Sequence, residues 1–134
     1  IRAYALFYLQ FIDRQFQAIE LFSDMVKLDP LHAGRKASLA GMFYFVGDKE
    51  GAIREARKAL QLDPEHIIAI DYLTLAYTDT KDIVALESLQ ASIRPVLQEQ
   101  PEIRALFGWS YAVRGDEEKA RKIYRVISDA IYEL

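Results

Sequence analysis

Two copies of the tripeptide Leu-Asp-Pro, at residues 28–30 and 62–64, are separated by a 34-residue interval and constrain this chain more than any other feature. A second pair of similar segments, Gly47–Ala52 and Gly115–Ala120, is separated by twice that interval. Both segments begin with Gly-Asp, continue with a Lys or Glu, and end with Ala. Recurrence at a fixed period of about 20 to 50 residues is typical of folds that stack one supersecondary unit repeatedly. The spacing therefore predicts a 34-residue internal repeat.

The 34-residue frame also sorts residues of similar size into columns. One mostly small column holds Leu6, Ala40, Thr74 and Gly108, and one of aromatic residues and leucine holds Leu9, Phe43, Tyr77 and Tyr111. A third column is mostly alanine, at Ala18, Ala52, Leu86 and Ala120. Antiparallel helices approach closely where a small residue faces the partner helix, so the columns predict stacked helix pairs.

The residues between the expected helices explain why each helix ends and the next one begins. In the pairs Gly47-Asp48 and Gly115-Asp116, glycine favours the left-handed conformation that ends a helix, and aspartate caps the next one. Pro30 and Pro64 cannot continue a helix, so they end the second member of a pair. No such pair buries its apolar face alone, and a core forms only when neighbouring pairs stack.

We therefore expect an all-α fold of about four antiparallel helix pairs, in repeats over about 1–32, 33–66, 67–100 and 101–134. The eight expected helices span about 1–12, 15–28, 32–46, 49–61, 66–79, 82–97, 101–114 and 117–133. Pro95 falls inside the sixth and removes one intrahelical hydrogen bond at a cost of about 3 kcal/mol. We expect it to kink or shorten that helix.

These columns, turns and terminal prolines resemble the tetratricopeptide repeat family, which is built from a 34-residue unit. The second repeat carries the resemblance best, and the fourth carries it well through Phe107-Gly108, Tyr111-Ala112 and Gly115-Asp116. The first departs by having Asp13-Arg14 where the glycine turn belongs, and the third has Leu86 for alanine and Gln98 for the terminal proline. The resemblance covers the whole chain and implies one domain, 1–134, forming a right-handed helical-repeat solenoid.

The family likeness also implies a concave groove, lined by the first helix of each pair, in which a peptide or a partner helix binds. Exposed aromatic residues are favoured at such interfaces. On this face the sequence places Tyr4, Phe7, Phe11, Tyr44, Phe45, Asp71, Tyr72, Leu75, Asp79 and Trp109. Two alternatives stay open, because these side chains could belong to the core, or flanking helices could fill the groove. Chaperone-binding members grip a carboxylate with Lys, Asn and Arg, and the corresponding face here offers no cation.

Composition narrows the function classes. The 134 residues have a net charge of −3 and no cysteine, which excludes disulfides and thiolate metal sites and disfavours a nucleic-acid partner. No apolar run approaches the roughly 20 residues that span a bilayer, so no membrane insertion is expected. The chain opens at Ile1 inside an apolar helical pattern and has no visible leader, so we expect a fragment of a longer protein. The compartment stays open, with the cytoplasm favoured.

Chemistry-bearing residues are sparse. His32 and His66 occupy the same slot of successive repeats, where stacking separates equivalent atoms by about 10 Å, too far to share one zinc ion. The serines lack a neighbouring histidine, and no glycine-rich phosphate loop occurs, so neither catalysis nor a cofactor is expected.

The two ends of the chain are apolar. Residues 1–11 are rich in aromatic side chains, and Ile123, Tyr124, Ile127 and Ile131 form an apolar stripe on the last helix. Repeat arrays need polar caps, so we expect these faces to be covered by flanking segments or by a second subunit, as in a homodimer. The sequence thus predicts a non-catalytic scaffold that binds a protein or peptide in its groove. The alternative is a homo-oligomerisation or spacer segment of a larger regulatory or assembly protein.

Overall fold

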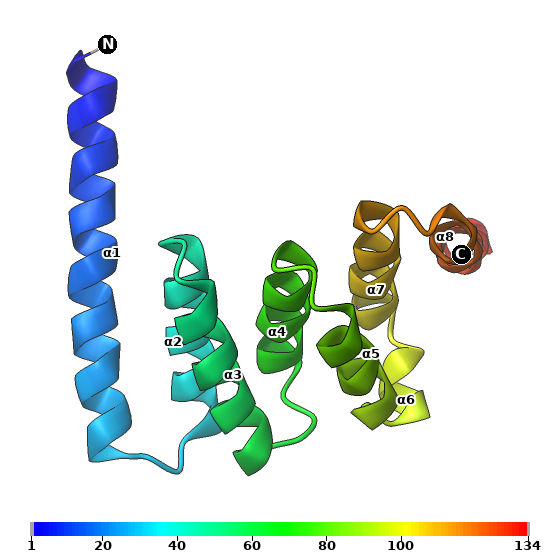
Figure 1. Cartoon of the computed structure of the whole chain (residues 1–134), viewed down its shortest axis with the longest axis horizontal. Helices are drawn as coiled ribbons and strands as arrows, with labels where there is room; N and C mark the ends of the chain where they lie inside the picture. The colour runs from blue at the N-terminus through cyan, green and yellow to red at the C-terminus, as the bar shows by residue number, and fades with distance from the viewer. Residues whose placement is uncertain (1, 134) are drawn as a thin grey trace. The chain divides into compact units, whose positions relative to one another are not determined.

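The computed structural model describes the backbone of residues 2–133 and the side chains of residues 13–129 and 131–133. Over that range the chain is all-helical and has no strand, which confirms the expected fold class at this level. The helices are α1 (Arg2–Leu28), α2 (Ala33–Phe45), α3 (Lys49–Leu62), α4 (Ile67–Asp79), α5 (Ile83–Ser92), α6 (Pro95–Gln98), α7 (Pro101–Val113) and α8 (Glu117–Tyr132) (Figure 1).

Two compact units divide the chain within α4. The N-terminal unit is Ile1–Tyr72, and the C-terminal unit is Leu73–Leu134. In the N-terminal unit α2 packs against both α1 and α3, and in the C-terminal unit α7 packs against α6 and α8. None of the helices in the described residues is long and apolar enough to cross a membrane.

Three turns reverse the chain in the same way, and they are spaced at the 34-residue interval of the repeat. Gly47 and Gly115 adopt the positive φ angles 87° and 83° that the sequence predicts for these glycines. Lys81 stands midway between them with φ 58°, so the third turn has the same geometry without a glycine. A left-handed residue with a side chain costs about 1–2 kcal/mol more than one without. The turn at Lys81 is therefore imposed by its surroundings.

An aspartate follows each of these residues and caps the next helix. The side chains of Asp48, Asp82 and Asp116 accept hydrogen bonds from the backbone N–H groups of Gly51, Ala85 and Lys119, at 2.8, 3.1 and 3.3 Å. Each bond satisfies an N–H group that has no partner within its own helix. The caps predicted at Asp48 and Asp116 are confirmed, and the cap at Asp82 extends the pattern to the turn between α4 and α5.

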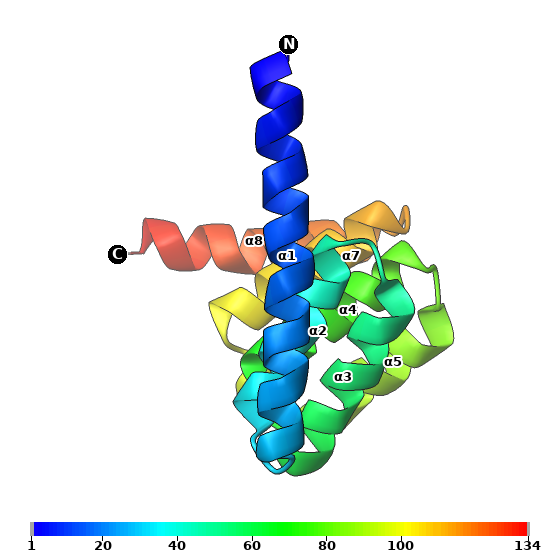
Figure 2. The same ribbon diagram turned by 90° about the vertical axis from the view of Figure 1, so that its left-hand side faces the viewer.

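At the first expected turn the chain does not reverse. Two helices were expected, over 1–12 and 15–28, but a single helix, α1, runs through both ranges, so this prediction is wrong (Figures 1 and 2). Asp13 and Arg14 lie inside α1, one repeat length before the turn at Gly47-Asp48. No glycine stands there, and a continuous helix satisfies the backbone hydrogen bonds without a left-handed residue. The first antiparallel pair is therefore absent.

The proline of the sixth expected helix has the effect predicted for it. Helix α5 ends at Ser92, Arg94 is extended with ψ 142°, and Pro95 starts the short helix α6 at its first position. A residue before proline avoids the helical region, so the chain breaks there. The amide of Gln98 donates hydrogen bonds to the carbonyl oxygens of Gln90 and Ile93, at 3.0 and 2.6 Å, which satisfies acceptors that the break exposes.

Alanines form the core of the N-terminal unit. Ala37, Ala40, Ala52, Ala56, Ala59 and Ala69 are completely buried, and Leu60 packs against Ala37, Ala59 and Ala69. Side chains this small let α2 and α3 approach closely, as the alanine column predicted. Helix α1 is packed far less completely, because Phe16 and Leu21 remain 53% and 60% exposed.

The core of the C-terminal unit contains a buried polar contact among its apolar side chains. Leu86, Ile103 and Phe107 are buried there with Thr78 and Ser110. The hydroxyl of Thr78 lies 2.9 Å from that of Ser110, and it also donates to the carbonyl oxygen of Thr74 at 2.7 Å. Buried hydroxyls without partners are costly, so this chain of bonds fixes α7 against the end of α4.

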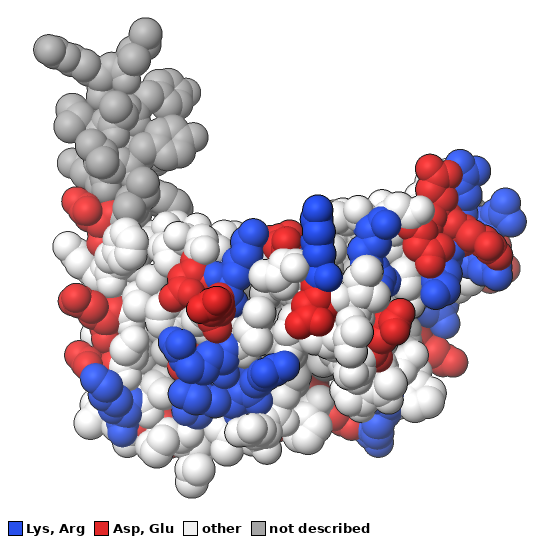
Figure 3. Space-filling model, viewed as in Figure 1, with Lys and Arg blue, Asp and Glu red and all other residues white. Residues whose placement is uncertain are grey.

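Charged side chains of both signs lie side by side on the face shown in Figure 3. The buried carboxylate of Glu55 pairs with Arg54 at 3.4 Å and with Lys58 at 3.3 Å. On α8, Arg121 and Lys122 pair with the glutamates four residues earlier, at 3.5 and 3.3 Å. The basic residues of α3 and α8 are thus interleaved with acidic ones.

Replacing Lys81 by glycine should stabilise the protein, because it removes the strain of a left-handed residue that carries a side chain. We expect Lys81→Gly to raise the free energy of unfolding by about 0.5–1 kcal/mol, after the greater freedom of glycine in the unfolded chain is allowed for. Denaturant unfolding followed by circular dichroism measures this. Lys81→Ala is the matched control, since it keeps the strain, and a gain as large as that of glycine would contradict the explanation.

Candidate protein-binding site

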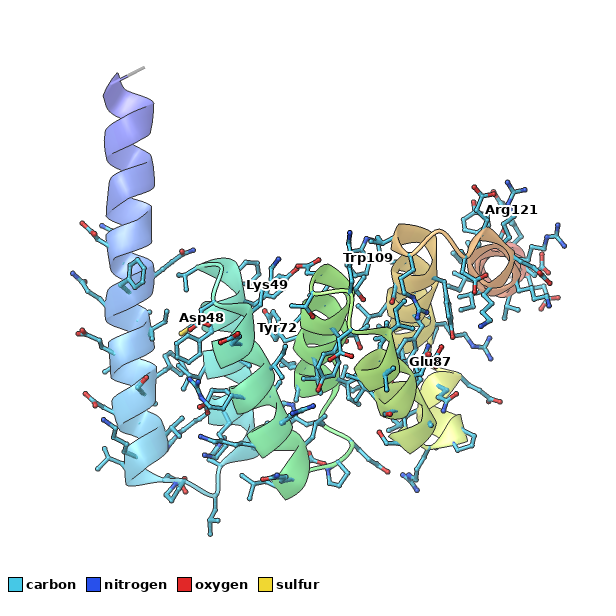
Figure 4. The ribbon with its side chains drawn as sticks, in the orientation of Figure 1. Asp48, Lys49, Tyr72, Glu87, Trp109 and Arg121 are labelled. Atoms are coloured by element: carbon cyan, nitrogen blue, oxygen red, sulfur yellow. The ribbon has the colours of Figure 1, made fainter. Side chains whose placement is uncertain are left out.

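Three of the aromatic residues predicted for the groove are in mutual contact. Tyr44 and Phe45 end α2, and Tyr72 extends from α4 toward them (Figure 4). The ring centroids lie 5.9 Å apart for Tyr44 and Phe45, and 6.0 Å apart for each of these with Tyr72. Phe45 meets the other two rings edge to face, at interplanar angles of 75° and 81°. This arrangement, here called the aromatic cluster, is the one that ring quadrupoles favour.

A glycine allows Tyr72 to take its place in the cluster. Gly41 is buried in α2, one turn before the two aromatic residues. A Cβ atom at Gly41 would lie 2.6 Å from Cε2 and Cζ of Tyr72 and 2.8 Å from its hydroxyl oxygen. Glycine inside a helix costs about 1 kcal/mol relative to alanine, and the close approach of the ring requires it here. The ring of Tyr72 therefore packs directly against the backbone of α2, not against a flexible side chain.

The cluster is open to solvent on one side. Phe45 is 66% exposed, while Tyr44 and Tyr72 are half-buried. Burial, together with the negative charge of the adjacent Asp71, raises the pKa of the Tyr72 phenol above its usual range. The Tyr72 hydroxyl is thus held neutral, and the polar groups that the three side chains contribute to the cluster are the hydroxyls of Tyr44 and Tyr72.

A recess adjoins the cluster on the side of Phe45. It has a volume of about 290 Å³ and lies between α1 and α2, where Arg14, Gln15, Ala18, Met42 and Phe45 line it. Apolar atoms form most of its wall, and Arg14 supplies the only charge among these residues. We call it the α1–α2 recess. No sequence signal pointed to it, because it exists only where α1 fails to turn back at Asp13.

Three other residues predicted for the groove belong to α4. Asp71 precedes Tyr72 in α4 and is half-buried, as are Leu75 and Asp79, which belong to the C-terminal unit. The side chains of Tyr4, Phe7 and Phe11 lie outside the described residues. The structure thus brings together Tyr44, Phe45 and Tyr72, with Asp71 beside them.

Trp109 belongs to a second apolar surface, between α7 and α8. It is 40% exposed and lines a groove of about 440 Å³ with Gly108, Ile123, Tyr124 and Ile127 among its neighbours. Helix α8 approaches the α7 backbone closely here, since a Cβ atom at Gly108 would lie 3.0 Å from Cγ2 of Ile123. The apolar stripe predicted on the last helix is confirmed as exposed at Tyr124, which is 71% accessible. From the sequence, Trp109 was expected in the groove and the stripe at the end of the array, and no contact between the two was predicted.

The two histidines are closer to each other than expected. His32 caps α2, and its Nδ1 accepts a hydrogen bond from the backbone N–H of Arg35 at 3.1 Å. A Cβ atom at Gly34 would lie 3.1 Å from Cε1 of His32 and 3.7 Å from Nε2 of His66, so both rings border the same glycine. The expected separation of about 10 Å is therefore too large. Over the described residues, no group of three or more His, Cys, Asp or Glu side chains could hold a metal ion.

No protein-family model matches this chain, and no curated protein shows significant similarity to it. Its function must therefore be inferred from the arrangement of its own side chains. The aromatic cluster, the α1–α2 recess and the α7–α8 groove are the features that bear on it.

The contact between Gly41 and Tyr72 can be tested by a double-mutant cycle. We expect Gly41→Ala to lower the free energy of unfolding by about 1–2 kcal/mol, because the added methyl group overlaps the Tyr72 ring and outweighs the better helix propensity of alanine. In a Tyr72→Ala background the same change should become neutral or stabilising. Denaturant unfolding of the four proteins gives the coupling. Equal effects in both backgrounds would show that the two residues do not touch.

The raised pKa of Tyr72 has a definite sign in stability. Because the folded-state pKa lies above the unfolded value of 10.0, the unfolded chain ionises first as the pH rises past 10. The contribution of this phenol is complete below pH 10 and is lost as the pH rises through the folded-state pKa. Tyr72→Phe keeps the ring and should therefore lose less stability above pH 10 than the parent protein. Denaturant unfolding at a series of pH values measures the difference, and identical slopes would contradict it.

Proposed function

We propose that this chain is a non-catalytic protein-interaction module of tetratricopeptide-like architecture, and that it binds a peptide or a helix of its partner at the aromatic cluster. The observation that carries the proposal is the cluster itself. Three aromatic rings are held in contact by the close approach of Tyr72 to Gly41, and Phe45 remains 66% exposed. A core cluster would bury such a ring, because exposing it forgoes the free energy of its transfer from water.

The geometry favours binding for entropic reasons. An interface loses about 0.5–1.5 kcal/mol for each flexible side chain that it immobilises. Tyr44 and Tyr72 are already held by neighbouring rings and by the α2 backbone, so little freedom is left to lose. Aromatic anchors of this kind dominate the binding energy of many protein interfaces.

The proposed architecture is supported by the turns. Left-handed residues at Gly47, Lys81 and Gly115 recur at the 34-residue interval, and an aspartate that caps the next helix follows each one. One supersecondary unit repeated at this interval is typical of stacked helix pairs, whose surfaces bind extended segments. The first pair is the exception, because α1 is continuous.

Peptide selection tests the binding site. A random peptide library displayed on phage should yield sequences that bind the immobilised protein, and the selected peptides should contain apolar or aromatic anchors. Their affinity, measured by fluorescence anisotropy, should fall at least about tenfold for Phe45→Ala, because an exposed anchor contributes to binding and little to folding. Tyr72→Ala should weaken binding as well.

Two variants serve as controls for this measurement. Leu28→Ala removes an exposed apolar side chain of α1 that lies far along the helix from the recess, and it should leave the affinity unchanged. Trp109→Ala alters the α7–α8 groove. Peptides that lose affinity only with Trp109→Ala, or with neither aromatic variant, would show that the aromatic cluster is not the binding site.

A further inference from the structure

Helix α1 is about twice as long as the helix it packs against. At 1.5 Å per residue, its 27 residues extend about 40 Å, against about 20 Å for the 13 residues of α2. Ala18 of α1 faces Met42 and Phe45 at the C-terminal end of α2 in the α1–α2 recess. The part of α1 that precedes Arg14 therefore runs beyond the end of α2 and does not lie alongside that helix (Figures 1 and 2).

Helix α1 runs past the end of α2 because the chain has no turn at Asp13. The 34-residue frame places Asp13 at the slot of Gly47, Lys81 and Gly115, which all have positive φ and reverse the chain. Asp13 is helical, so residues 2–12 continue in line with α1 and do not fold back onto α2 of the same copy. Reversal there would place Asp13 in the left-handed region, which glycine adopts more readily, and would break the backbone hydrogen bonds of α1 across the site.

The C-terminal unit shows what belongs in the recess. There, Ser110 of α7 meets Thr78, which lies 32 residues earlier in the chain, with their hydroxyl oxygens 2.9 Å apart. Met42 occupies the slot of Ser110, two repeat lengths before it. The same relation pairs Met42 with Gln10. In the structure Met42 instead lines an open recess. The recess therefore lies within the space that residues 2–12 would occupy in a complete helix pair.

Side-chain sizes in the sequence support that pairing. Gly41 touches the ring of Tyr72, which belongs to the next repeat, so a small residue on one helix receives a large one from the next. The same spacing, moved back by one repeat length, pairs Phe7 with Ser38. Here the large residue comes first and the small one second, and the pair again combines one aromatic ring with one small side chain. In this register the segment 2–12 is complementary in side-chain size to α2.

We propose that two copies of this chain exchange their first helical segments, so that residues 2–12 of each copy fill the α1–α2 recess of the other. Exchange keeps both α1 helices continuous and still covers the recess. A two-fold arrangement of this kind is closed, since each copy gives one segment and receives one. It would complete the surface beside Phe45 with side chains of the partner copy. The proposal does not depend on peptide binding at the aromatic cluster.

The first experiment restores the missing turn. Asp13→Gly combined with Arg14→Asp copies the Gly47-Asp48 turn into α1, which should let residues 2–12 fold back onto their own copy. By sedimentation equilibrium across the micromolar range, we expect the parent protein to be a dimer and the double variant to be a monomer of unchanged helicity. Lys81→Gly is the matched control, because it places glycine at a turn that already exists, and it should remain dimeric. A monomeric parent protein, or a double variant that stays dimeric, would overturn the proposal.

The second experiment identifies which copy fills the recess, and it does not require the turn variant to fold. The chain has no cysteine, so introduced thiols can pair only with each other. Gln10→Cys and Met42→Cys, mixed as two single variants and oxidised gently, should give a covalent heterodimer. Gln10→Cys mixed with Leu28→Cys is the control and should give only the background expected from collision. A double variant, Gln10→Cys with Met42→Cys, should form covalent dimers, and an internal disulfide within a monomer would contradict the exchange.

Discussion

One backbone constraint organises this structure, the reversal of the chain at a single left-handed residue. At Gly47 and Gly115 the φ angle is positive, and the aspartate that follows caps the next helix with its side chain. Reversal sets two helices antiparallel and close, and the buried alanines of α2 and α3 then form a core that neither helix has alone. Where the reversal is absent, at Asp13, a continuous helix replaces a pair and apolar surface remains exposed.

The positions of three turns could be predicted from the sequence: glycine marks two of them, and the 34-residue frame places the third at residues 80–81. The left-handed conformation of Lys81 could not be predicted, because its side chain opposes that conformation by about 1–2 kcal/mol, which the cap at Asp82 and the buried Leu86 offset. The break at Pro95 was predictable for the opposite reason, since a ring that removes a hydrogen bond and clashes with the preceding turn cannot be offset easily. Continuity through Asp13 was missed because periodicity does not distinguish a helix pair from one long helix.

For the candidate site, the sequence identified residue types better than contacts. Tyr44, Phe45 and Tyr72 were expected on one face, and they do meet. Their contact depends on Gly41, whose missing side chain makes room for a ring from the following repeat, and such a pairing follows from three-dimensional packing. Trp109, assigned to that face by its position in the repeat, belongs to the C-terminal unit and lines an apolar groove with Ile123 of α8. The apolar stripe of α8 and the tryptophan of α7 form one surface because these two helices pack against each other.

Phe45 connects the two inferences physically. Its ring contacts Tyr44 and Tyr72 on one side, and it lines the α1–α2 recess on the other. A segment that fills the recess must therefore reduce the exposure of Phe45 or change its orientation. Either effect alters the free energy of binding at the aromatic cluster, and by thermodynamic linkage a ligand bound at the cluster alters the free energy of filling the recess by the same amount. The sign depends on whether the bound ring retains the edge-to-face contact with Tyr72 that the structure shows. If it does, a filled recess holds Phe45 in its binding orientation, and dimer formation and partner binding favour each other.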